Sequence, residues 1–172
     1  MACLAKISSA IEYDCSNGFV GFAKVAAVNR EDIESFSIVD GDVKAISFAA
    51  STAYIGVASQ KKSFSVSESA RVNDNAPNAY VHEVTVTVFE KENPKLFNEL
   101  VNGKLVFFTN YRNYYRVFGL YYGLSVTASA MNSSENGGWA TFTLTTPEAV
   151  LGEDYLTVEA TVASQVFTGA NI

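Results

Sequence analysis

The chain has 172 residues, of which 48% are hydrophobic and 17% are charged, and its formal net charge is −6. This composition excludes an intrinsically disordered protein, and the length suits a single domain spanning residues 1–172. The acidic balance argues against a protein that grips the phosphate backbone of nucleic acid, because such proteins need clustered Lys and Arg. No stretch approaches the roughly 18 apolar residues of a membrane helix, so we expect no membrane partner.

The N-terminal stretch indicates neither a metal site nor export. Cys3 and Cys15 are the only cysteines, and a disulfide between them would close a short loop that constrains little, so we expect two reduced thiols. Neither has the spacing to a second cysteine or a histidine that zinc requires, and we expect no metal and no cofactor. The first residues lack a basic segment followed by a long apolar run, so we expect a protein kept in the cytoplasm or in something assembled there.

Most of the chain alternates apolar and polar side chains with the period of two that is typical of half-buried β-strands. In residues 80–90, for example, Val84 and Val86 share one face while Thr85 and Thr87 share the other. Strands are predicted, in chain order, at residues 19–28, 43–49, 62–69, 80–90, 104–109, 114–118, 124–128, 139–145 and 155–162. Asn-Gly and Asp-Gly turns separate several of them, and about nine closely spaced strands favour a sandwich or barrel.

One α-helix is predicted over residues 94–102. Asn93 can cap it, Pro94 suits the first helical position, and Gly103 follows the last turn. Its narrow apolar stripe, which predicts a helix lying flat on the sheet, consists of Leu96, Phe97, Leu100 and Val101. A shorter helical turn is predicted at residues 29–34. The expected fold is therefore mainly β, an antiparallel β-sandwich or half-barrel with one flanking α-helix.

Residues 71–79 (RVNDNAPNA) lie between two strongly patterned strands and predict a projecting hairpin loop at about residues 70–80. Such a polar loop is usually a solvated tip, but loops of this kind also contact neighbouring molecules, and the sequence leaves both interpretations open. The candidate contact residues are Arg71, Asn73, Asp74, Asn75, Pro77 and Asn78.

No pattern in the sequence indicates an enzyme. His82 is the only histidine and shares a strand face with Val84, which indicates a buried structural histidine rather than a catalytic base. The acidic pair at 153–154 falls in a predicted turn. Two acidic residues that occur in a loop by chance explain it better than the paired carboxylates of a glycosidase. The aromatic run at 111–122, with its interleaved arginines, resembles a surface that stacks bases or sugars, but its alternation favours an aromatic-rich strand.

A series of weak motifs runs through residues 1–148. In chain order these are MACL, YDCSNGFVGFAKV, NREDI, VDGDVKAIS, SFSVSESARVNDN, YVHEVTVTVF, LVFFTNYRNYYRVFGLYYGLSVT and NGGWATFTLTTPE. In this order they resemble the tail-tube-like structural proteins of phages and prophages of Bacteroidetes bacteria. The most telling stretch is residues 104–127, where Phe118-Gly119 and then Gly123 precede another strand.

The resemblance implies a virion protein of the phage tail that is assembled in the host cytoplasm. It implies rings of the chain itself, hexameric or higher, other phage tail proteins as partners, and transient, non-specific passage of DNA through an acidic lumen. The N-terminal arm, about residues 1–18, and the C-terminal extension, about residues 149–172, would clasp neighbours, and the loop at 70–80 would reach the adjacent ring. The lumen-facing residues would be Ser63, Ser65, Ser67, Glu83, Thr85 and Thr87.

The residues after Glu148 depart from the resemblance, because a further strand is predicted at 155–162. This departure indicates, as a variant, a ring used once in the tail rather than a repeated tube subunit. Two other classes remain open: a non-phage adhesin or pilin-like β-sandwich, and a carbohydrate-binding module or small β-barrel enzyme resting on the aromatic run.

Overall fold

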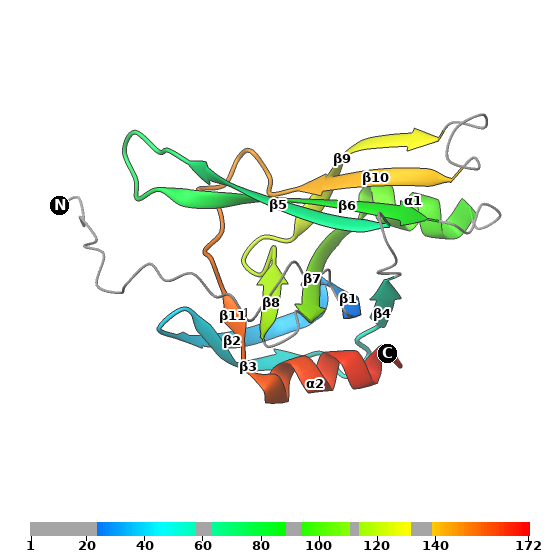
Figure 1. Cartoon of the computed structure of the whole chain (residues 1–172), viewed down its shortest axis with the longest axis horizontal. Coiled ribbons are helices and arrows are strands. Elements are labelled where there is room, and N and C mark those ends of the chain that lie inside the picture. Colours follow the sequence, from blue (N-terminus) through cyan, green and yellow to red (C-terminus); the bar gives the residue numbers. More distant parts are fainter. Residues whose placement is uncertain (1–23, 58–62, 89–93, 111–113, 132–138) are drawn as a thin grey trace, which may run out of the picture.

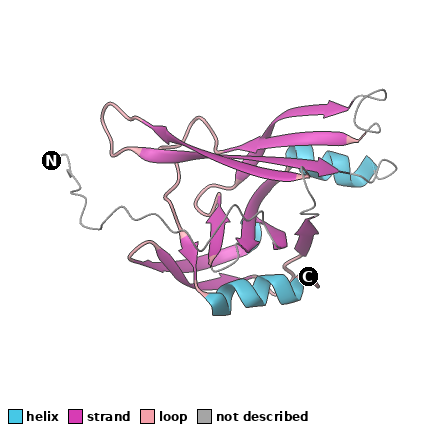
Figure 2. Ribbon diagram, in the orientation of Figure 1, coloured by secondary structure: helices cyan, strands magenta, loops and turns pink. Residues whose placement is uncertain are grey.

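Strands dominate the computed structural model, which describes residues 24–57, 63–88, 94–110, 114–131 and 139–172 (Figure 1). The elements in chain order are β1 (Lys24–Asn29), the 3-10 turn η1 (Arg30–Asp32), β2 (Ile33–Val39), β3 (Asp42–Phe48), β4 (Tyr54–Val57), β5 (Phe64–Arg71), β6 (Ala79–Val88), α1 (Pro94–Asn102), β7 (Lys104–Asn110), β8 (Tyr115–Phe118), β9 (Leu124–Met131), β10 (Ala140–Thr145), β11 (Thr157–Val158) and α2 (Ala160–Gly169). The expected fold class is confirmed, because the molecule is mainly β, with helices flanking a sandwich or half-barrel of strands (Figure 2).

The strands belong to one continuous sheet that divides into two halves (Figure 1). The half at the top of the figure, called the upper sheet below, consists of β9, β10, β6 and β5 in that order, each antiparallel to its neighbour. The lower half runs β2-β3-β11-β8-β7, and β1 lies between β7 and β4. The halves meet where Lys104 pairs with Ser125 and Leu105 pairs with Leu124.

Two hydrophobic cores follow from this division. The inward row of the upper sheet packs against β1 and β7, and its buried members include Phe64, Val84, Val86, Phe142 and Leu144. The second core fills the space between the lower strands and α2, and its buried members include Val43, Val106, Leu156, Val166 and Phe167. Strands with one apolar face thus bury that face and leave the other free for solvent or partners.

Helix α1 begins at Pro94 and ends before Gly103, whose N–H donates to the carbonyl of Glu99 at 2.8 Å, so the predicted helix is confirmed. Its predicted cap, Asn93, lies outside the described residues. No residue of α1 is fully buried, and Val101, predicted to face the sheet, is 51% exposed. The apolar stripe is therefore only partly covered by the chain's own strands.

The predicted strand at 155–162 is wrong. Only Thr157 and Val158 form a strand, and the helix α2 begins at Ala160. Its buried residues follow the three-to-four spacing of a helix: Val162, Ala163, Val166 and Phe167.

The predicted C-terminal extension, about residues 149–172, is not a free arm. β11 pairs in parallel with β3 and antiparallel with β8, so this short strand joins two strands that are otherwise separate. Leu156, Val158 and the inner face of α2 lie in the lower core. The predicted N-terminal arm, about residues 1–18, lies outside the described residues.

The structure adds two strands that the sequence pattern did not predict, β2 and β4. β2 forms a hairpin with β3 through Asp40 and Gly41, whose φ angles of 53° and 79° are the positive values that hairpin turns require. The predicted helical turn at 29–34 is present as the shorter η1. Within the described residues, no helix is long and apolar enough to span a membrane.

Candidate functional site

Hydroxyl side chains cover the outward face of the upper sheet. Its rows are defined by strand pairing: Ser65 pairs with Thr85, which pairs with Thr143 on its other side. The hydroxyl-bearing members are Ser65, Ser67, Ser69, Thr85, Thr87, Thr141, Thr143 and Thr145. Consider the part of this face from Ser65 to Ser69 on β5, together with the outward residues opposite them on β6, β10 and β9. Within this part, Glu83 is the sole charged residue. We call this surface the hydroxyl face.

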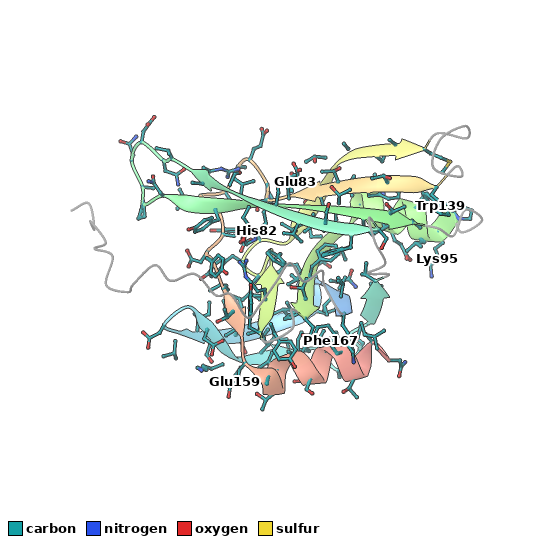
Figure 3. The ribbon with its side chains drawn as sticks, in the orientation of Figure 1. His82, Glu83, Lys95, Trp139, Glu159 and Phe167 are labelled. Atoms are coloured by element: carbon teal, nitrogen blue, oxygen red, sulfur yellow. The ribbon has the colours of Figure 1, made fainter. Side chains whose placement is uncertain are left out.

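The hydroxyl face contains five of the six residues predicted to face a lumen. Ser65, Ser67 and Glu83 are exposed, and Thr85 and Thr87 are half-buried beside them. Figure 3 shows Glu83 and His82 on opposite sides of the upper sheet. Ser63 does not belong to this face, because it is 2% exposed and precedes the strand.

The edge of the upper sheet at β5 is open. The N–H of Thr87 donates to the carbonyl of Ser63 at 2.8 Å. From this pair onward, residues of β5 alternate between pointing their backbone groups toward β6 and pointing them away from it. The residues whose backbone N–H and C=O groups point away from β6 are therefore Phe64, Val66, Glu68 and Ala70. Among the described residues, no strand pairs with this side of β5.

β5 lacks two of the usual protections against edge pairing, and its one inward-facing charge, Glu68, is paired with Arg116 inside the subunit. The strand contains no proline or lysine, and its eight pairs with β6 are in regular register. By contrast, the edge strand β2 is irregular at two points in its pairing with β3, β9 is irregular at one point in its pairing with β10, and the edge strand β4 has four residues. The β5 edge is thus the one best suited to pair with another chain.

The opposite edge of the upper sheet is β9. It pairs with β10 along its length, but with β7 only through Leu124 and Ser125. Within the described part of the chain, no strand pairs with this side of β9 from Val126 to Met131. As far as the described residues go, the upper sheet is therefore unpaired at both edges.

The hairpin loop predicted to contact neighbours is partly tied to its own chain. Arg71 Nη1 donates to the carbonyls of Pro147 and Val150, at 3.3 and 2.6 Å. Asn73 Nδ2 donates to the carbonyl of Leu151 at 3.2 Å. Asn78 Oδ1 also accepts the Asn73 N–H. Of the predicted contact residues, those left exposed are Asp74, Asn75, Pro77 and Asn78.

A buried ionic cluster lies under the upper sheet. Arg116, 3% exposed, donates to both oxygens of Glu68, Nη1 to Oε2 at 2.7 Å and Nη2 to Oε1 at 2.6 Å. Arg116 Nε also donates to the carbonyl of Leu156 at 3.2 Å, and its guanidinium lies 3.5 Å from the ring centre of Tyr155. One arginine therefore connects the edge strand β5, the strand β8 and the segment before β11.

Glu68 is held ionised by this cluster. Burial alone would raise its pKa, but the adjacent His82 imidazole and the Arg116 guanidinium outweigh burial and lower the pKa to about 2. His82 is 1% exposed, and its Nδ1 accepts the N–H of Gly119 at 3.2 Å. Its Nε2 lies 3.0 Å from Glu68 Oε1 but meets no acceptor with good hydrogen-bond geometry among the described residues.

The sequence pattern placed His82 correctly on the core face but did not predict this cluster. Glu68 and Arg116 are 48 residues apart in the chain, and no local motif links them. A second unpredicted contact involves Glu153, which is 1% exposed and accepts the N–H groups of Tyr121 and Tyr122 at 3.0 and 3.1 Å. Burial raises the pKa of Glu153, against the opposing effect of these hydrogen bonds.

These buried groups act as structural connectors. Arg116 and Glu68 satisfy each other, and Glu153 holds a turn, so their polar atoms serve contacts within the chain. Within the described part of the chain, the outer side of β5 and that of β9 beyond Ser125 pair with no further strand. Comparisons with protein-family models, with curated proteins and with solved structures find no match for this chain.

Proposed function

We propose that this chain is a structural subunit that joins copies of itself edge to edge into a ring of the phage tail, hexameric or higher, with the hydroxyl face turned to a lumen through which DNA passes. Its partners are further copies of itself and other tail proteins. The observation that carries the proposal is that, among the described strands, the upper sheet ends in two unpaired edges that run in opposite directions.

The two edge strands run in opposite directions because the upper sheet has an even number of antiparallel strands. Each of the four strands is antiparallel to its neighbour, so β5 and β9 run antiparallel to each other. Rotation about an axis roughly parallel to the strands preserves these directions. When β5 of one subunit meets β9 of the next, the pair is therefore antiparallel, as every pair within the upper sheet already is. Successive subunits can thus close into one antiparallel barrel without exposed edges.

Pairing of this kind also matches the two faces. In β5 the outward row contains Ser65, Ser67 and Ser69, and the inward row contains Phe64, Val66 and Glu68, of which Glu68 is paired with Arg116. A register that places Ser beside the outward residues of β9 places apolar side chains beside its inward residues, whereas a slip of one residue reverses both. The shear of a closed barrel shifts the register by even steps and preserves this match.

The chemistry of the hydroxyl face suits passage of DNA. Hydroxyl groups hydrogen-bond to water, and Glu83 adds one negative charge per subunit. DNA is bound mainly through contacts of Lys and Arg with its phosphates, and the central part of this face carries neither. A lumen of this composition would let the polyanion pass without holding it.

Engineered disulfides test the proposed seam between subunits. In a chain with Cys3→Ser and Cys15→Ser, Ala128→Cys on β9 is combined in turn with Ser65→Cys, Ser67→Cys or Ser69→Cys on β5. We expect at least one pair to yield covalent oligomers under mild oxidation, because facing residues of paired strands lie within disulfide range.

The matched control combines Ala128→Cys with Ser47→Cys, which is exposed on β3 in the lower half and should remain uncrosslinked. Size-exclusion chromatography with light scattering gives the mass of the unmodified protein in parallel. A strictly monomeric protein at every concentration, together with three pairs that fail to crosslink, would show that the ring proposal is wrong.

A carbohydrate-binding module is the second candidate, and one observation favours it. Tyr155 and Tyr80 are 48% and 40% exposed, with ring centres 6.3 Å apart, and Tyr155 lies on the guanidinium of Arg116. Such rings can stack on sugars, although the hydrogen-bond donors of Arg116 serve Glu68 and Leu156. Glycan binding that Tyr155→Ala abolishes would support this second function.

A further inference from the structure

Helix α1 leaves part of an apolar surface uncovered. Leu96, Phe97 and Leu100 are half-buried, and Val101 is 51% exposed. Met131, on the inward side at the end of β9, is 60% exposed. Exposed apolar side chains that adjoin a half-buried stripe are typical of a surface that a partner completes.

This surface lies at the β9 edge of the upper sheet. Phe97 packs on Phe142 of β10, with ring centres 5.5 Å apart, and α1 contacts β9. Figure 1 shows α1 on the side of the upper sheet that faces the lower half, away from the hydroxyl face. The helix thus covers the inward side of this edge, where the sheet ends without a further strand.

The pairing register identifies what would continue the sheet there. One inward row runs Phe64, Val86, Phe142, Ser129 from β5 to β9. In a ring, β5 of the next copy would lie beside β9. If the pairing register is not shifted along the strands, Phe64 of that copy would then lie beside Ser129. Val66, two residues further along the same strand, faces the same side. Both side chains are apolar, as a surface under α1 requires.

We propose that α1 bridges the seam between subunits, with Val101 and Met131 packing on the inward apolar row of the β5 strand of a second copy of this chain. This inference rests on the proposed ring. It assigns the helix a role in assembly, because a docked β5 would bring Val66, which is only half-buried in its own subunit, to the exposed side chains of Val101 and Met131. Hydroxyl groups would meet on one side of the seam and apolar groups on the other.

Charge substitutions at the exposed apolar positions test the bridge. Val101→Asp and Met131→Asp each place a carboxylate where the neighbour would pack, but both positions are more than half exposed in the monomer. We expect association to weaken by about tenfold or more, since a buried carboxylate without a partner is costly, while the thermal midpoint of the isolated subunit stays near that of the wild type. Lys95→Gln, on the exposed side of α1, changes the net charge equally and should assemble normally.

A crosslink covers the case in which the charged variants fold poorly. Val101→Cys with Val66→Cys, in a chain without native cysteines, should form disulfides between subunits and not within one. The outcomes separate the two proposals. A wild-type protein that stays monomeric overturns the ring. A wild-type ring that Val101→Asp and Met131→Asp leave unchanged, with no Val101–Val66 crosslink, overturns the bridge alone.

Discussion

The carboxylate of Glu68 compensates a charge that the fold has removed from water. Arg116 is 3% exposed, so replacing its bidentate partner leaves a buried guanidinium without its carboxylate. We expect Glu68→Gln to lower the free energy of unfolding by about 3 kcal/mol, measured by urea denaturation at pH 7. Glu99→Gln, whose side chain is 62% exposed on α1, should change it by less than about 0.5 kcal/mol. Equal effects of the two substitutions would contradict a structural role for the cluster.

The same carboxylate predicts a specific acid sensitivity. The folded-state pKa of Glu68 is about 2, below the ordinary value of 4.5. A carboxyl with a lowered pKa contributes stability that is fully present above its unfolded-state pKa and is lost as pH falls toward the folded-state pKa. The wild type should therefore lose more stability than Glu68→Gln between about pH 4.5 and pH 2. The raised pKa of Glu153 changes the stability with pH in the opposite direction. This contribution is the same in both proteins, so it cancels when they are compared. Parallel pH profiles would refute this assignment.

At the scale of elements, α2 is expected to be essential to the fold. Phe167 is 5% exposed in the lower core. Phe167→Ala should reduce the free energy of unfolding by about 3 to 5 kcal/mol, because it removes buried apolar contacts and leaves a cavity. Thr168→Ala, at the next and exposed position, should have little effect in the same denaturation experiment. A tolerant Phe167 would indicate that α2 is a detachable arm after all.

The strands of the upper sheet could be predicted because each has one buried and one open face. Residues 80–90 and 139–145 alternate clearly, and β6 and β10 occupy most of those ranges. α2 could not be predicted in this way, because Leu156, Val158 and Val162 mimic a period of two across the junction between β11 and the helix. Tertiary packing decides between the two readings, and it is absent from a local pattern.

The candidate site likewise has features that a local sequence pattern predicts and features that it does not. Side-chain alternation along a single strand predicts the exposed serines and threonines of the hydroxyl face. It does not predict that β5 is the last of the described strands in the upper sheet, or that Arg116 meets Glu68, because both depend on which distant strands are neighbours. Ser63 shows the limit of alternation, since it is buried and β5 begins only at the next residue, Phe64.

At the scale of the whole molecule, the open edge can be blocked without disturbing the monomer. The Ala70 N–H points away from β6, so Ala70→Pro removes a donor that the subunit itself does not use. We expect light scattering to show loss of oligomers while the thermal midpoint changes little. Ala70→Ser keeps the N–H and should assemble like the wild type. Rings that persist with Ala70→Pro would place the seam elsewhere.

The lumen predicts how assembled rings respond to charge. Glu83→Arg replaces one negative with one positive charge per subunit on the hydroxyl face, so a ring would gain a belt of arginines. We expect rings of this variant to retain DNA in a filter-binding assay, with retention falling steeply as salt rises, because phosphate contacts release counterions. Glu34→Arg, exposed on β2, makes the same change outside the proposed lumen and should retain little. Equal retention by both variants would contradict a lumen at the hydroxyl face.

The place of β11 between β3 and β8 has a consequence for synthesis. Both of its neighbours leave the ribosome before it does, and β3 leaves more than a hundred residues earlier, since Thr157 pairs with Asp42. The lower half therefore cannot close until β11 has left the ribosome, whereas every strand of the upper sheet lies before β11 in the chain. A nascent chain thus carries its open β5 edge before its own fold is finished. Neighbouring chains on one messenger would meet through that edge before β11 completes the lower half of each subunit.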